Sequence, residues 1–288
     1  MTAALQAQMP ASLMRPVRLD VPFFAQERYQ CGPAALAMAL AADGAAVTAE
    51  QLMPEVYLPA REGALQAEML ATARRHGRLA VVLPPRLDAV LTEVAAGRPV
   101  IVLQNLSLPF APLWHYAVVV GFDLAQGQIS LHSGTTANLG LSLAVFERTW
   151  ARSGHWAMAS TSPDLLPDTP DDTTLLAAIA ALERVDAGAA VRAFTAMTQR
   201  APDLYGAWFG LGNARHATGD LAGAQQAFSR ATQIDGQAAD AWNNLALTRL
   251  ALGQREPARI AATRAIALGG PRAARYRETL AAIERAAP

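Results

Sequence analysis

The sequence predicts an α+β domain over residues 17–165, followed by an all-α repeat domain over residues 171–288. In the first part, segments with helical periodicity come first and short apolar strands cluster later, an order typical of α+β folds. In the second part, residues recur at a spacing of 34, which is typical of a helical solenoid. Residues 162–172 contain three prolines and several acidic side chains, so we expect a linker there.

The elements of the first domain follow from periodicity, capping signals and apolar runs. Thr48 and Gln51 form a capping-box pattern that opens a short helix. Apolar residues at helical spacing predict helices over 32–43, 64–76 and 87–96. Short apolar or alternating runs predict strands over 79–83, 99–104, 115–122, 128–133 and 155–160, with Gly127 in the turn between the third and fourth.

The second domain contains three units of 34 residues, over 171–204, 205–238 and 239–272, and one capping helix over 273–286. The middle unit resembles the tetratricopeptide repeat (TPR), which has W-x2-L-G, a Gly turn and A-x3-F-x2-A. The matching residues are Trp208, Leu211, Gly212, Ala224, Phe228 and Ala231. The third unit departs from this pattern, with Ala246 in place of Gly and Ala262 in place of Phe.

Composition excludes several classes of protein. The 288 residues carry 24 basic and 24 acidic side chains, so a broad electrostatic footprint for nucleic acid is not expected. No apolar run is long enough to cross a membrane as a helix, so we expect no integral membrane segment. The single cysteine excludes an intramolecular disulfide, and the five histidines lack metal-ligand spacing. We therefore expect neither a metal nor another cofactor.

Cys31 is the first candidate for chemistry. It stands directly before a predicted helix that begins with Gly32 and Pro33. A thiol at a helix N-terminus faces unpaired N–H groups, which favour the thiolate and lower the pKa from about 8.5. The sequence therefore predicts a nucleophile at Cys31. The alternative is a buried thiol with a packing role only.

Two further residues fit the same chemistry. Gln26 stands five positions before Cys31, where its amide can donate to an oxyanion beside the Cys31 backbone N–H. His115 begins an apolar strand, from which a general base can reach a helix packed across the sheet. The alternatives are a surface glutamine and a core histidine with satisfied hydrogen bonds.

Together these residues form the pattern Q-x4-C-G-P-A, a long gap and H-Y-x-V-V-x-G, which resembles the C39-like peptidases. This papain-like group includes domains that process bacteriocin leaders, and the resemblance covers residues 17–161. It implies a papain-like α+β domain in which Cys31 is the nucleophile, His115 the general base and Gln26 the oxyanion donor. With the TPR units, the chain resembles a stand-alone bacterial subgroup of this family.

One position departs from the family. An Asp usually ends the strand after the His strand, and here that position aligns with Ser133 or His132. If the hairpin turn centres near Leu124, residue 133 lies opposite His115 on the same face. Ser133 can then hydrogen-bond His115 but cannot stabilise imidazolium as a carboxylate does. Asp123 is about 8 residues, or roughly 27 Å, from His115 along the strand and cannot substitute.

The functional expectation is a cysteine peptidase that cleaves a peptide or protein, with the TPR groove binding the substrate or a protein partner. Trp114 and Tyr116 flank His115, where they line a substrate groove or pack in the core. The alternative function is a weak or inactive peptide-binding module on a TPR scaffold. Relatives of the subgroup imply a periplasmic or envelope location, whereas Met1 as the true start would imply the cytoplasm, because the N-terminus lacks a secretory signal pattern.

Overall fold

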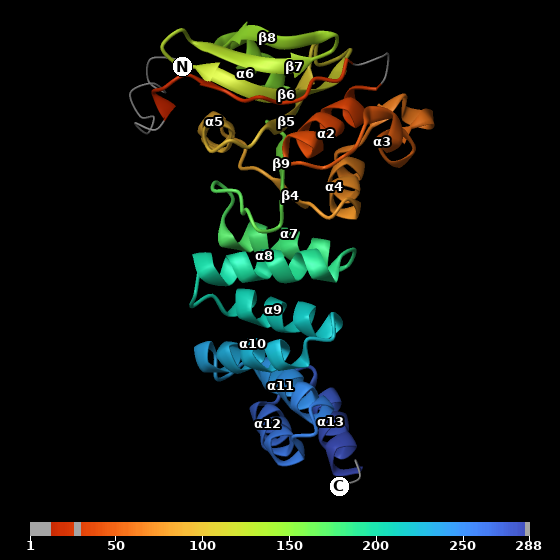
Figure 1. Ribbon diagram of the computed structural model, residues 1–288, viewed down its shortest axis with the longest axis vertical. Coiled ribbons are helices and arrows are strands. Elements are labelled where there is room, and N and C mark those ends of the chain that lie inside the picture. The colour runs from red at the N-terminus through yellow and green to blue at the C-terminus, as the bar shows by residue number, and fades with distance from the viewer. Residues whose placement is uncertain (1–12, 26–29, 286–288) are drawn as a thin grey trace. The chain divides into compact units, whose positions relative to one another are not determined.

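The computed structural model describes residues 13–25 and 30–285 (Figure 1). Contacts between residues divide the chain into two compact units, residues 1–178 and 179–288. The division falls inside helix α7 (Asp172–Glu183), which the sequence assigns to the first repeat. Each unit is described separately below.

A twisted antiparallel sheet forms the centre of the first unit. Its strands lie in the order β4, β9, β5, β6, β7, β8, and β1 pairs with the end of β6. The bounds are β1 Val17–Arg18, β4 Leu79–Val82, β5 Val100–Asn105, β6 Trp114–Asp123, β7 Gln128–Ser133, β8 Thr136–Ser142 and β9 Ala157–Thr161. A separate two-stranded sheet joins β2 (Tyr57–Leu58) to β3 (Gly63–Ala64). This sheet-rich α+β architecture is the predicted fold class.

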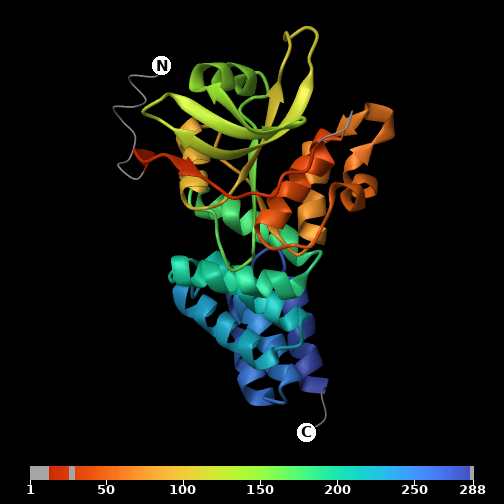
Figure 2. The same cartoon turned by 45° about the horizontal axis from the view of Figure 1, so that its top comes forward.

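Helices cover both faces of the large sheet, as Figures 1 and 2 show. Alternate residues of β6 divide between two apolar cores, with Tyr116, Val118 and Val120 in one and Ala117 and Val119 in the other. The first core contains α2 (Cys31–Ala42), α3 (Ala49–Val56) and α4 (Gln66–Arg75), and the second contains α5 (Leu87–Ala95) and α6 (Leu143–Ala151). Helix α2 is apolar on all sides and buried from residue 32 to residue 40, as expected for a helix that the rest of the domain surrounds.

The structure confirms the predicted capping box at the start of α3. The capping box is present, because the Thr48 N–H donates to Gln51 Oε1 at 2.9 Å and the Gln51 N–H donates to Thr48 Oγ1 at 3.4 Å. Strand β8 and helix α6 were not predicted. Strand β8 lies at the edge of the sheet and buries neither face fully, so its sequence lacks the alternation that identifies a strand.

The proline-rich segment after β9 is held against the first unit. The buried carboxylate of Glu93 accepts hydrogen bonds from the Thr169 N–H at 2.8 Å and the Thr169 hydroxyl at 2.7 Å. Arg98 pairs with the same carboxylate at 2.6 Å and also with Asp168. These bonds give the segment a defined path along the domain, although its composition suggests a loose linker.

The second unit consists of helices that pack in sequence order. Gly219 and Gly253 occupy equivalent turns 34 residues apart, with φ of +83° and +74°, a conformation that favours glycine. The helices are α8 Ala187–Arg200, α9 Tyr205–Ala217, α10 Leu221–Ile234, α11 Ala239–Ala251, α12 Arg255–Leu268 and α13 Ala273–Arg285. This run of helices confirms the predicted solenoid.

Packing within the solenoid can be compared at the positions where the third unit departs from the repeat pattern. A Cβ atom added at Gly212 would lie 2.5 Å from the ring of Phe228, so a large ring here requires a glycine opposite. The equivalent positions in the next repeat are Ala246 and Ala262. Because Ala262 lacks a ring, the position opposite can carry a methyl group. The two departures are therefore sterically compatible with each other.

We expect Gly212→Ala to destabilise the second unit by about 1–3 kcal/mol, because overpacking against Phe228 exceeds the gain of about 1 kcal/mol in helix propensity. Urea unfolding of the full chain measures this change. Gly236→Ala is the matched control, since the nearest atom to its added Cβ is an ordinary 3.7 Å away. The double variant Gly212→Ala, Phe228→Ala should lose less free energy of unfolding than the sum of the losses in the two single variants. Simple additivity would contradict the proposed clash.

Candidate active site

Cys31 is the first residue of helix α2, and its thiol is free and half-buried. The backbone N–H groups of Gly32, Tyr116 and Cys31 itself point toward the sulfur and stabilise its charged form. Gly32 also lets the start of α2 pack closely against β3, because a Cβ atom there would lie 2.4 Å from Cβ of Ala64. The start of α2 therefore places the sulfur against β6, beside the residue that follows His115.

His115 lies on β6 and is half-buried. Its Nε2 atom is 2.9 Å from Oγ of Ser133 at the end of β7. Among the described residues its Nδ1 atom has no hydrogen-bond partner. When Nε2–H donates to Ser133, Nδ1 is the unprotonated nitrogen and can accept a proton. The Ser133 hydroxyl can either accept or donate this bond, so the bond is compatible with the tautomer that a general base needs but does not enforce it.

The register between β6 and β7 differs from the predicted one. The turn spans residues 124–127, and a bulge lies between Val119 and Gly121, so Val118 pairs with His132. Continuing this register places Ser133 beside Ala117, two positions from His115. A shift of two residues keeps the side chains on one face, so the hydrogen bond forms diagonally across the strands.

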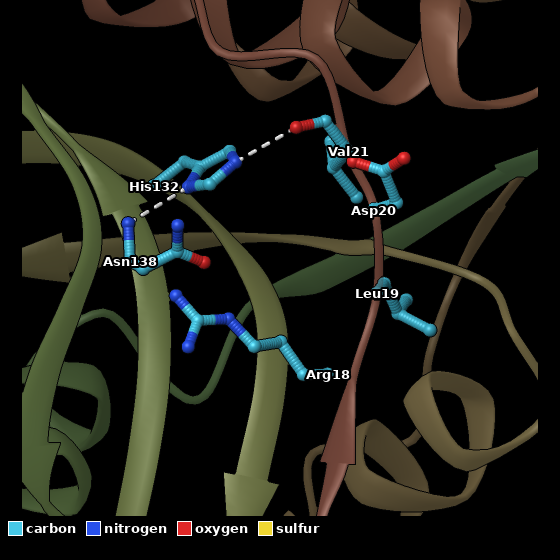
Figure 3. A pocket seen from close by; sticks show the side chains of 6 residues that line it. All are labelled: Arg18, Leu19, Asp20, Val21, His132 and Asn138. Carbon is cyan, nitrogen blue, oxygen red and sulfur yellow. Dashed lines mark hydrogen bonds between the residues drawn. The ribbon is translucent and has the colours of Figure 1, made fainter.

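His132 is not an alternative partner for His115. It is buried, its Nδ1 accepts the Asn138 N–H at 3.1 Å, and its Nε2 lies 3.0 Å from the Val21 carbonyl oxygen. Figure 3 shows the imidazole between these two groups. Both ring nitrogens are therefore occupied, and the possible assignment of His132 to the family's Asp position is wrong. A cavity of about 290 Å³ here is lined by Arg18, Leu19, Asp20, Val21, His132 and Asn138, and excludes Cys31 and His115.

Asp123 ends β6 at the far end from His115 and accepts the Gln126 N–H at 3.0 Å within the hairpin turn. Among the described residues, no carboxylate bonds to His115. Those residues also contain no cluster of three or more acidic, His or Cys side chains that could hold a metal ion. The polar partner of the imidazole is a hydroxyl.

The two aromatic neighbours of His115 differ in exposure. Tyr116 is 2% exposed, packs edge-on against Trp156 and donates its hydroxyl to the Ala64 carbonyl at 3.3 Å. Its predicted role in a substrate groove is therefore wrong, because the side chain belongs to the core. Trp114 is half exposed, and its contact with substrate stays a prediction. Gln26 lies outside the described residues.

Burial changes the expected charge state of the candidate pair. Desolvation raises the pKa of the Cys31 thiol more than the surrounding N–H groups lower it, contrary to the expected depression. Desolvation also lowers the pKa of His115. Both shifts favour the uncharged forms, so the resting pair is a thiol and a neutral imidazole. A nucleophile of this kind loses its proton to the base as it attacks.

The reactivity of Cys31 should therefore depend strongly on pH. We expect its alkylation by iodoacetamide to increase at higher pH than that of an ordinary thiol, whose pKa is about 8.5, because burial raises the pKa of the folded thiol. The signal belongs to Cys31 alone, since the chain has one cysteine. The same protein unfolded in urea is the control and should titrate at the ordinary value. A constant fast rate from pH 6 upward would instead indicate a preformed thiolate, contrary to this expectation.

Comparison with known families agrees with this architecture. Residues 18–158 match the model of the Peptidase_C39 like family, and residues 205–237 match a tetratricopeptide repeat. The first unit is a C39-like peptidase-fold domain. The helical unit that follows the C39-like domain contains TPR repeats.

Solved structures show similarity to each part of the chain. A C39-like peptidase from Bacillus anthracis is 20% identical over 54% of this chain and 100% of its own, with a TM-score of 0.43. MamA is 20% identical over 38% of this chain and 65% of its own, with a TM-score of 0.36. The chaperone SycD of Yersinia enterocolitica is 20% identical over 39% and 82%, with a TM-score of 0.37. No curated protein matches the chain.

Proposed function

We propose that the protein is a cysteine peptidase in which Cys31 attacks a peptide carbonyl and His115 is the general base. The observation that carries the proposal is the hydrogen bond between His115 Nε2 and Ser133 Oγ at 2.9 Å, with the thiol lying against the N–H of Tyr116. In this proposal Nδ1 of His115, which has no hydrogen-bond partner among the described residues, is the nitrogen that accepts the thiol proton. The C39-like fold supports the same assignment.

In the proposed reaction, Nδ1 of His115 takes the thiol proton while the sulfur bonds to the carbonyl carbon. His115 then gives that proton to the leaving amine, and a water molecule, deprotonated by the same imidazole, releases the acyl group. The N–H of Cys31 at the start of α2, together with the proposed amide of Gln26, would stabilise the oxyanion. Ser133 is a positioning residue, because it orients the ring without contacting substrate.

The helical unit supports a second part of the proposal. TPR repeats present extended surfaces for peptides and protein segments, so we propose that residues 179–288 bind the substrate or a protein partner.

In the described part of the chain, no helix has both the length and the apolar character that are needed to span a bilayer.

A second candidate function is peptide binding without cleavage. It is favoured by one observation, that the described residues offer His115 a hydroxyl and no carboxylate. Incubation of a peptide library with the wild type and with Cys31→Ala, followed by mass spectrometry, separates the two. Fragments formed only by the wild type support the peptidase. Peptides retained intact by both proteins support the binding module.

A further inference from the structure

The turn between β5 and β6 exposes an unusual number of apolar side chains. We call residues 106–114 the apolar hairpin; it is the gold-to-yellow loop that projects beyond the sheet in Figure 2. Phe110 is 83% exposed, and the other exposed apolar residues are Leu106, Leu108, Leu113 and Trp114. Exposed apolar groups concentrated on one short segment mark a binding surface more often than chance.

The hairpin is held in shape from within the protein. Buried Asn105 accepts the N–H groups of Ser107 at 3.0 Å and Leu113 at 2.9 Å through its Oδ1 atom. Arg152 donates to the carbonyl oxygens of Asn105 at 3.2 Å and Ser107 at 2.7 Å. The Leu106 N–H also donates to the Leu113 carbonyl at 2.9 Å. A backbone ordered in this way lowers the entropic cost of binding, because the loop does not have to be ordered by its partner.

The hairpin leads directly into the candidate site. Trp114 is the first residue of β6 and pairs with Asn105, and His115 follows it on the same strand. A chain that reaches His115 therefore passes close to the base of the hairpin. Trp114 therefore joins the hairpin to His115 along the chain, and its side chain is half exposed.

The lack of charge on the hairpin indicates which kind of partner it binds. No charged residue occurs from residue 99 to residue 122, so the hairpin offers no ionic contacts. Loops that bind lipid surfaces commonly combine apolar side chains with Lys or Arg. The arginine beneath this hairpin, Arg152, is used by backbone carbonyls. An uncharged apolar segment of polypeptide is therefore a better match than an anionic membrane.

We propose that the apolar hairpin is a docking arm that binds apolar side chains of the peptide substrate near the bond to be cut. This inference rests on the proposed Cys31–His115 peptidase and names the class of substrate that it takes. Peptides with large aliphatic or aromatic residues near the scissile bond should be preferred over polar peptides of the same length.

The test uses fluorogenic decapeptides in which a Leu-Phe pair is moved through an Ala-Ser-Gly background. In Leu108→Ser combined with Phe110→Ser, we expect KM for the best Leu-Phe peptide to rise about tenfold or more, with kcat little changed. Peptides without the pair should be unaffected. Val145→Ser is the matched control, since Val145 is 44% exposed on α6 of the same unit. Unchanged alkylation of Cys31 verifies that the double variant keeps its site.

A binding assay separates failure of this inference from failure of the peptidase. If the wild type cuts nothing, anisotropy of fluorescein-labelled Leu-Phe peptides with Cys31→Ala replaces the kinetic measurement. Loss of binding in the hairpin variant would then support the arm although the peptidase proposal fails. Cleavage with unchanged KM in the hairpin variant, or no binding by any peptide, overturns the arm. Two other results would also overturn the arm if the hairpin variant keeps its peptide affinity. One is that the wild type sediments with phosphatidylcholine–phosphatidylglycerol vesicles and the hairpin variant does not. The other is that the wild type forms a dimer and the hairpin variant does not.

Discussion

Replacing Cys31 by alanine should abolish peptide hydrolysis, and replacing His115 by glutamine should reduce kcat/KM by about 10³-fold or more. The sulfur is the proposed nucleophile, and the resting thiol is uncharged because burial raises its pKa. Such a thiol needs a base at the moment of attack. The loss on removing His115 should therefore be larger than in a site that stores a thiolate.

A matched control for His115→Gln is His76→Gln in the same unit. His76 ends helix α4 and pairs with Glu55 at 3.0 Å on the surface of the domain. Its replacement should leave kcat/KM within about twofold of wild type, as is usual for surface substitutions. Thermal unfolding of each variant checks that the fold is intact. Equal hydrolysis by wild type and a folded His115→Gln variant would refute the assigned base.

Ser133→Asp should increase kcat/KM by about tenfold, because a carboxylate at this position can accept the Nε2–H of His115 and stabilise the imidazolium formed during attack. The wild-type hydroxyl already lies 2.9 Å from Nε2, so the geometry for the bond is present. The new negative charge favours the protonated ring and raises the pKa of His115, opposing the depression that burial causes. A nearby imidazolium also favours the thiolate, so alkylation of Cys31 near pH 7 should become faster.

Ser133→Asn separates the effect of charge from that of size, since the amide matches the carboxylate in shape but is neutral. We expect it to leave kcat/KM near the wild-type value, whereas Ser133→Ala should lower it by up to about tenfold through loss of ring orientation. Kinetics and alkylation rates measured together over pH 5–9 distinguish these effects. Equal rates in the Asp and Asn variants would show that a carboxylate here does not assist the reaction.

Local features of the fold could be predicted because they depend on residues close together in the chain. The helix after Cys31, the capping box at Thr48 and the 34-residue repeat are of this kind. The motif around Cys31 and His115 indicated the C39-like domain for the same reason, because its residues stand at characteristic short spacings. Asn105 and Arg152 were not singled out, since no short spacing connects them and their contacts exist only in the folded sheet.

Several features of the candidate site depend on residues distant in the chain. The turn at residues 124–127 and a one-residue bulge after Val119 together place Ser133 two positions from its predicted partner, and hydrogen-bond pairing across strands decides where such a bulge falls. Burial decides that Tyr116 is a core residue and that His132 has no free nitrogen. Neither property follows from the identity of the residue alone.

The two classes of domain and the order of most elements could be predicted from the sequence, because periodicity, capping and short motifs are local. The same local motifs pointed to Cys31 and His115 as candidates for chemistry. The diagonal register of the Ser133–His115 hydrogen bond, the raised pKa of Cys31 and the ordered apolar hairpin could not be predicted from local patterns. Those outcomes depend on desolvation and on contacts between strands, which arise when distant segments pack together.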